Sequence, residues 1–183
     1  MDQLTQVAAD LGQDRIPARP FVLVGQMNKA DPTRSPAGTE TVWAYTHVPL
    51  RVRSDGGGDL TGTWDASEVE TFADRVEGEI EAHAPGFRSL VTGRHVLSPP
   101  ALEALDANLV GGALGGGTTA LSQQVIFRPI PGLGRAETPV RGLYLASASA
   151  HPGGGVHGAC GANAARACLA ADRFRSLLPR AKR

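Results

Sequence analysis

The chain has 183 residues, enough for one domain with a hydrophobic core or for one lobe of a larger protein. Apolar residues make up 42% of the sequence and charged residues 20%, a composition that excludes an intrinsically disordered chain. Eighteen Lys and Arg balance eighteen Asp and Glu, so the formal net charge is zero. There is therefore no electrostatic case for nucleic acid or an anionic membrane surface as a partner.

Three further features favour a cytoplasmic protein. No apolar run approaches the roughly 18 residues of a membrane helix. The first residues include acids and have no continuous apolar stretch, unlike a signal peptide. Cys160 and Cys168 are the only cysteines, and on one helix they would lie roughly 12 Å apart, too far for a disulfide. We read both as small packing residues in a reducing compartment.

The first 65 residues predict one short helix and two strands. Apolar residues recur at helical spacing over 4–11, and Gly12 supplies a stop. The runs 19–25 and 41–49 are rich in strand-forming residues. Alternation in the second run places three aromatic side chains on one face: Trp43, Tyr45 and His47. From the residues alone, packing in the core is the first expectation for Trp43 and Tyr45.

The clearest helix begins at Ser67, a candidate N-cap, and ends before Pro85 and Gly86. Its apolar stripe consists of Val69, Phe72, Val76 and Ile80. The segment 98–109 starts with Ser98 before a proline and predicts a second, shorter helix.

The C-terminal part predicts strands over 124–129 and 141–147, followed by a helix from about residue 156 to Leu178. The order of elements indicates an α+β fold of mixed short strands with a terminal strand–glycine loop–helix unit. We expect residues 1–130 and 131–183 to pack as one lobe.

The stretch HPGGGVHGACGANAARACL (151–169) has the composition of a ligand site. Three glycines allow close backbone approach, and the alanine-rich helix that follows offers unpaired N–H groups and a positive dipole end to an acceptor. It matches neither the Walker loop nor the dinucleotide fingerprint. From the residues alone, a ligand site and tight helix–strand packing both remain open.

The run RPIPGLGRAETPVRGLYLASASAHPGGGVHGACGANAARACL (128–169) resembles the C-terminal FAD-contacting segment of phytoene dehydrogenase-like flavoproteins. These belong to the superfamily of amine oxidase-type flavoenzymes. Earlier segments, among them DPTRSPAGTETVWAYTHVP and LSPPALEALDANLVGGALGGG, resemble the same family in the same order. The resemblance covers about residues 20–172 and implies the C-terminal lobe of an FAD/NAD(P)-binding-type flavoprotein. In that lobe, residues 1–130 would be the substrate-domain-like portion and 131–183 the FAD-contacting strand–loop–helix. The resemblance also makes lining of a substrate pocket the alternative to core packing for Trp43 and Tyr45.

The resemblance implies a place for FAD. The isoalloxazine ring would face the N-terminus of the last helix, and the end of the preceding strand would lie near the ribityl and pyrophosphate groups. The strand-end positions are Ser147, Ala148 and Ser149. The positions nearest the ring are Gly154, Gly155, Val156 and His157. The family often has glycine where Ser147 stands, so here a hydroxyl must fit beside the cofactor.

The implied function is an FAD-dependent oxidoreductase that transfers a hydride from an apolar or amine substrate to the flavin. Such proteins open with a Rossmann unit for the ADP half of FAD, and no G-x-G-x-x-G lies near the start of this sequence. We therefore expect FAD binding to need a Rossmann-type N-terminal half, here a possible partner chain. A truncated, non-catalytic interaction module that dimerises or seeks a partner is the first alternative. An FAD-dependent double-bond isomerase is the second.

No catalytic acid, base or metal site is predicted. His151 and His157 flank the glycine loop, but no third ligand is near them in the sequence, which favours loop structure or flavin contact over a metal pair.

Overall fold

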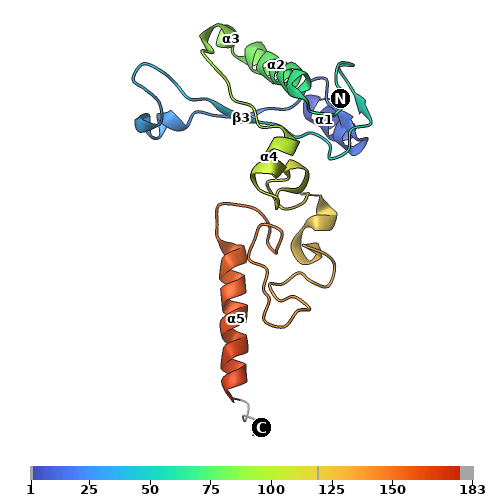
Figure 1. Ribbon diagram of the computed structural model, residues 1–183, viewed down its shortest axis with the longest axis vertical. Coiled ribbons are helices and arrows are strands. Elements are labelled where there is room, and N and C mark those ends of the chain that lie inside the picture. The colour runs from blue at the N-terminus through green and yellow to red at the C-terminus, as the bar shows by residue number, and fades with distance from the viewer. Residues whose placement is uncertain (1, 119, 178–183) are drawn as a thin grey trace. The chain divides into compact units, whose positions relative to one another are not determined.

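The computed structural model describes residues 2–118 and 120–177 (Figure 1). The chain divides into two compact units, Met1–Ser98 and Pro99–Arg183. The boundary between these units lies after residue 98. The sequence-based division after residue 130 separated two functional portions of one lobe and is a different kind of boundary.

Two of the helices in the first unit begin at aspartate caps. α1 (Gln3–Gly12) starts after Asp2, whose carboxylate accepts a hydrogen bond from a backbone N–H of the first turn. α2 (Ala66–His83) starts after Asp65, which accepts two such bonds. Ser67, the predicted N-cap, therefore lies inside the helix, because the carboxylate two residues earlier already satisfies the first N–H groups. A short helix, α3 (Phe87–Leu90), follows.

Four short strands form two separate ladders. β1 (Arg15–Ile16) pairs in parallel with β4 (Ser54–Asp55), and β2 (Leu23–Gly25) pairs antiparallel with β3 (Trp43–Tyr45). The last two lie inside the predicted runs 19–25 and 41–49 but are shorter. Pro20 and Pro49 lack the N–H that a ladder needs, which limits how far the runs can pair.

The core of the first unit consists of Ile16, Leu60 and Phe72, and Phe72 comes from α2. Around it lie the half-buried side chains of Val48, Val52, Trp64 and Val76. Two residues of the predicted stripe of α2 thus face the core. Burial of each large side chain contributes about 1.5–3 kcal/mol.

Two buried carboxylates hold the turn region between β4 and α2. Asp55 accepts hydrogen bonds from three backbone N–H groups in 57–60 and from the Arg75 guanidinium. Glu68 accepts bonds from N–H groups of residues 61, 62 and 64. Side chains of α2 therefore fix the path of a segment with few apolar residues.

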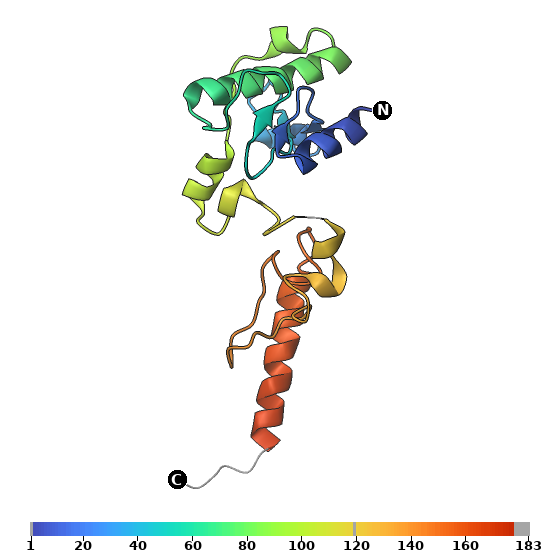
Figure 2. The ribbon, with the colours of Figure 1, turned by 90° about the vertical axis from the view of Figure 1, so that its right-hand side faces the viewer.

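The second unit contains helices and turns. Its elements are α4 (Pro99–Leu105), η3 (Val110–Gly112), η4 (Leu121–Gln123), η5 (Val125–Phe127) and α5 (Ala159–Leu177). In Figures 1 and 2 the loops between η5 and α5 run beside the first half of α5. Among its described residues the only β pairing is an isolated bridge, Glu137 to Tyr144.

Several predictions for this unit are wrong. The run 124–129 contains the 3-10 turn η5 in place of a strand, and 141–147 forms no strand. Both have strand-like composition, but a strand needs a neighbour to bond, and the described part of the unit offers 141–147 a single bridge. The helix predicted over 98–109 ends at residue 105, and α5 begins at 159 rather than near 156 because the glycine loop extends further.

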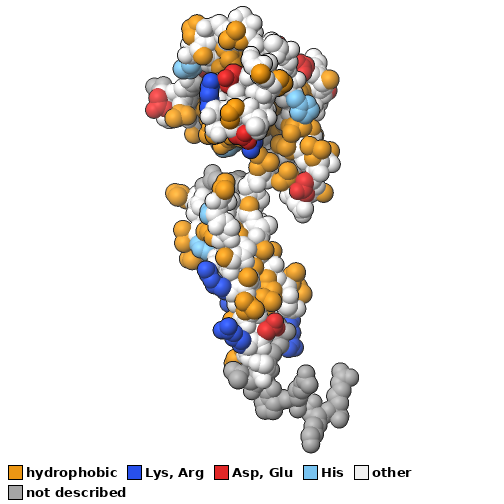
Figure 3. All heavy atoms as spheres, turned by 90° about the vertical axis from the view of Figure 1, so that its left-hand side faces the viewer, with side chains coloured by type: hydrophobic (Ala, Val, Ile, Leu, Met, Phe, Trp, Pro, Cys, Tyr) orange, Lys and Arg blue, Asp and Glu red, His pale blue; other side chains and the backbone are white. Residues whose placement is uncertain are grey.

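Many large apolar side chains are exposed in both units, as the orange areas of Figure 3 show. In the second unit they include Val140, Leu143, Val156, Leu169 and Phe174. Within residues 2–118 and 120–177 no helix is both long and apolar enough to cross a membrane.

Candidate functional site

Two glycine clusters that are far apart in the sequence meet in the second unit. A β-carbon on Gly116 would lie 2.9 Å from the backbone nitrogen of Ser149. A β-carbon on Gly154 would lie 3.6 Å from the Cα of Gly115 and 3.7 Å from the Cβ of Ala148. The 115–117 loop therefore passes directly against the residues that the resemblance assigns to FAD.

The residues 147–149 form a tight turn in place of the predicted strand end. The hydroxyls of Ser147 and Ser149 share a hydrogen bond of 2.6 Å, and the Ala150 N–H donates to the Ser147 carbonyl. The Ser147 hydroxyl is exposed but already engaged. A ligand would therefore have to share this hydroxyl with Ser149.

His157 caps the start of α5. Its Nδ1 accepts a 3.0 Å hydrogen bond from the Ala159 N–H. Among the described residues, the next two N–H groups of the helix, those of Cys160 and Gly161, have no carbonyl partner. The Cys160 thiol donates to the Gly153 carbonyl at 3.3 Å and so ties the glycine loop to the helix.

A shallow hollow of about 130 Å³ lies between the turn and the helix start. It is lined by Ala146, Ala148 and residues 153–155 and 157–161. Four of the seven predicted contact residues, namely Ala148, Gly154, Gly155 and His157, are therefore in the lining. Ser147, Ser149 and Val156 are not, and Val156 projects fully into solvent.

The lining suits the edge of a flat or anionic group. It consists mainly of glycine and alanine, so backbone can approach a ligand closely, and a β-carbon on Gly161 would meet nothing within 4 Å. The unpaired N–H groups and the helix dipole favour negative charge there. The sequence of the second unit carries nine Lys or Arg against four Asp or Glu, which acts in the same direction.

A buried arginine behind the loop was not predicted from the sequence. Arg128 is 3% exposed and donates through Nε to the Ala148 carbonyl at 2.9 Å. The available signal was a charged residue in the otherwise apolar, strand-like run QVIFRP. Since arginine is rarely buried without a partner, an arginine in such a run indicates that specific acceptors surround it.

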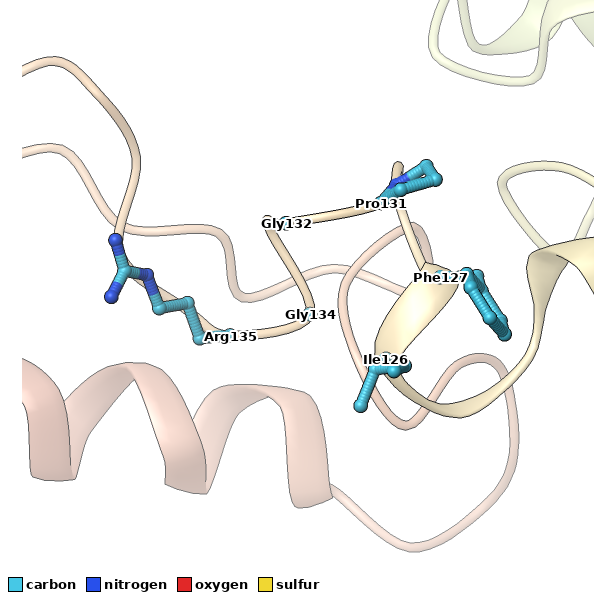
Figure 4. A pocket seen from close by; sticks show the side chains of 6 residues that line it. All are labelled: Ile126, Phe127, Pro131, Gly132, Gly134 and Arg135. Atoms are coloured by element: carbon cyan, nitrogen blue, oxygen red, sulfur yellow. The ribbon is translucent and has the colours of Figure 1, made fainter.

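A second hollow, of about 400 Å³, lies between η5 and the 131–135 loop (Figure 4). Ile126, Phe127, Pro131, Gly132 and Gly134 line it, and Arg135 extends away from Phe127. Its lining offers no side chain for acid, base or metal chemistry. It is an apolar surface hollow.

The two histidines near the loop have separate roles. The His151 Nδ1 bonds the Val125 carbonyl at 2.9 Å, whereas His157 caps α5. Among the described residues no group of three or more His, Cys, Asp or Glu side chains is placed to hold a metal ion.

Comparison with known proteins finds related sequences but no matching structure. No family model and no solved structure matches the chain. Proteins from Rattus norvegicus and Mus musculus, both named pyridine nucleotide-disulfide oxidoreductase domain-containing protein 2, are each 40% identical over 148 residues, or 80% of the chain. A phytoene desaturase (lycopene-forming) from a Paracoccus strain is 29% identical over 138 residues, or 75% of the chain.

The chain spans about a quarter of the length of these relatives, 24% of the rat and mouse proteins and 25% of the phytoene desaturase. The similarity supports the predicted relation to flavin-type oxidoreductases at the level of general kind. It leaves the substrate and the site residues as predictions.

Proposed function

We propose that this chain is the flavin-facing lobe of an FAD-dependent oxidoreductase that transfers a hydride from an apolar or amine substrate. The observation that carries the proposal is the meeting of two glycine loops at the start of α5, in a chain 40% identical to proteins named as oxidoreductases. The fold would then be the C-terminal lobe of an FAD/NAD(P)-binding-type protein, acting in the cytoplasm.

The residues of the hollow would hold one edge of the cofactor. Gly154 and Gly155 allow the backbone to approach it, and the N–H groups of Cys160 and Gly161 are available to an anionic acceptor. When bound, FAD supplies the hydride-accepting N5. His157 keeps the helix start in shape by accepting the Ala159 N–H, and Cys160 keeps the loop on the helix.

The proposal includes a Rossmann-type portion, in the same polypeptide or in a partner chain. The hollow is shallow and open, so it contacts one edge of a ligand and leaves the rest uncovered. The exposed side chains of Val140, Leu143 and Val156 flank the segments that lead into the hollow. Burying them against that portion would complete the cofactor site and a small-molecule substrate site.

A non-catalytic interaction module is the second candidate. The exposed apolar side chains of α5, Leu169 and Phe174, favour it because they would also suit dimerisation or a protein partner. A double-bond isomerase would use the same FAD site, so flavin binding separates the module from both enzymes, and substrate turnover separates the enzymes from each other.

The test is FAD titration followed in the flavin absorption band, with the chain alone and with a Rossmann-type half supplied. We expect weak binding by the chain alone and tight binding by the pair. Gly154→Val should weaken binding about tenfold or more, because its methyl groups fill the hollow without a backbone clash.

Gly93→Val is the matched control, since a β-carbon there meets nothing within 4 Å and lies outside the second unit. Absence of FAD binding even by the pair would contradict the enzyme proposal and leave the interaction module. Equal binding by Gly154→Val and the parent would show that the hollow is not the cofactor site.

A further inference from the structure

Arg128 is the most deeply buried charged side chain of the described second unit, at 3% exposure. Its guanidinium donates to four backbone carbonyls. The Nη groups bond the carbonyls of Gly115, Thr118 and Gln123, and Nε bonds that of Ala148. These acceptors come from separate segments, so one side chain joins the 115–118 loop, η4 and the 147–149 turn.

The guanidinium also lies directly behind the glycine loop. A β-carbon on Gly153 would come 3.2 Å from the Arg128 Nε and 3.3 Å from its Cδ. Gly153 is buried and has a φ of +108°, a backbone conformation that favours glycine. The loop therefore takes its path over the arginine, with the hollow beside it.

The 3-10 turn η5, which directly precedes Arg128, is held by a hydrogen bond from His151. Val125, in η5, has a φ of +51°, which is rare for a β-branched residue. Its carbonyl accepts the bond from His151 Nδ1. The same few residues thus fix both the loop and the arginine behind it.

The charge of Arg128 is unbalanced. All four acceptors are neutral carbonyls, and no Asp or Glu side chain in the described residues pairs with it. Removing a guanidinium from water without a carboxylate partner carries a large desolvation cost, and carbonyl dipoles offset only part of it. A neutral side chain would join these loops at less cost. The buried positive charge therefore points to a negative charge held close to it, on the other side of the glycine loop, when the site is filled.

We infer that Arg128 is a positioning residue of the flavin site, which shapes the glycine loop and stabilises negative charge on a bound flavin nucleotide. This inference rests on the proposed function. The negative charge belongs either to the diphosphate of the cofactor or to its reduced ring. A fixed cation behind the loop would stabilise either one.

The experiment compares the parent with Arg128→Met, Arg128→Lys and, as control, Arg141→Met, all paired with the Rossmann-type half. Arg141 is an exposed arginine of the same unit, so its variant makes the same change of charge. The measurements are FAD affinity, riboflavin affinity and the reduction potential of the bound flavin. Far-UV circular dichroism checks the fold.

Arg128→Met should weaken FAD binding about tenfold or more, while Arg141→Met should not. If the charge acts on the diphosphate, riboflavin affinity and the potential stay unchanged. If it acts on the reduced ring, the potential becomes more negative. Arg128→Lys keeps the charge and should restore at least half of the lost affinity on a logarithmic scale, or the parental potential.

Loss of FAD affinity to the same extent in Arg128→Met and Arg128→Lys, with an unchanged potential, would overturn the inference and leave a purely structural arginine. If Arg128→Met fails to fold, Arg128→Lys is compared with the parent, and a tenfold or greater loss of FAD affinity with an unchanged potential, although the charge is kept, would overturn the inference. Absence of flavin binding by the parent would contradict the proposed function and this inference together.

Discussion

Gly116 and Ser149 touch through their backbones: a β-carbon on Gly116 would lie 2.9 Å from the Ser149 nitrogen and 3.2 Å from its Cα. Gly116 also has a φ of +63°. Gly116→Ala should therefore destabilise the second unit by about 1–3 kcal/mol, because the turn must shift to admit the methyl group. Hydrogen exchange should rise at the amides of residues 147–155.

Gly142→Ala separates the contact with Ser149 from the backbone strain of a side chain at positive φ. Gly142 has a φ of +82°, but a β-carbon there meets nothing within 4 Å. It should show the backbone strain alone, without faster exchange over 147–155. Equal exchange profiles for the two variants would mean that the contact with Ser149 does not hold the turn.

The sequence marked the glycine loop at 153–155 as a special backbone segment, but it did not show that the 115–117 loop packs against the neighbouring turn. Local composition shows that a backbone position is special, whereas the contact of residue 116 with residue 149 depends on how the intervening loops fold. The same limit explains the failed strand at 141–147. Its residues favour a strand, yet a strand forms only where a neighbour supplies hydrogen bonds.

Helices were predicted well, and their end details less so. The stripe of α2 placed Phe72 correctly in the core because helical spacing is a local property. The roles of Asp65 and Glu68 were missed. Glu68 lies in the first helical turn, and its side chain reaches back to three N–H groups of the preceding segment.

Asp55 and Arg75 form a buried ion pair through two hydrogen bonds, of 2.7 and 2.8 Å. Asp55→Asn should cost about 3 kcal/mol of unfolding free energy, because it leaves the arginine buried without its charge partner. Urea unfolding followed by tryptophan fluorescence measures this for the first unit, since Trp43 and Trp64 both lie in it.

Asp59 provides the control for that pair. Its carboxylate lies 3.8 Å from Arg75 and its side chain is 69% exposed, so solvent screens the interaction. Asp59→Asn should change the unfolding free energy by less than about 1 kcal/mol. A loss as large as that of Asp55→Asn would contradict the role of burial.

Acid should destabilise the first unit below about pH 4.5. Burial acts to raise the pKa of Asp55, but hydrogen bonds from Arg75 and the turn N–H groups outweigh it and lower the pKa from 3.8 to about 2. The Thr61 hydroxyl, with backbone N–H groups, lowers the pKa of Glu68 from 4.5 to about 2. Both folded-state pKa values are lowered, so this stability is present above the unfolded-state values and is lost as pH falls toward 2.

Urea unfolding at a series of pH values tests this directly. The unfolding free energy should be flat from about pH 7 to pH 5 and should fall steadily below that. In Glu68→Gln the fall should be shallower, because one of the two carboxylates no longer takes up a proton on unfolding. An identical slope in parent and variant would show that Glu68 does not contribute.

The two tryptophans should differ sharply in what they contribute to stability. Trp64 packs edge-on against Phe72, with ring centroids 5.6 Å apart, at the margin of the core. Trp43 lies on the β2–β3 ribbon beside Tyr45 and is 46% exposed, which excludes core packing for this aromatic face. Trp64→Ala should cost about 3 kcal/mol, and Trp43→Ala less than about 1 kcal/mol, because only the first opens a cavity. Unfolding is followed here by far-UV circular dichroism, since each variant removes a fluorophore. A soluble quencher should reach Trp43 more readily than Trp64. Equal losses of stability in the two variants would show that Trp43 is buried in the folded protein and would contradict its exposed position.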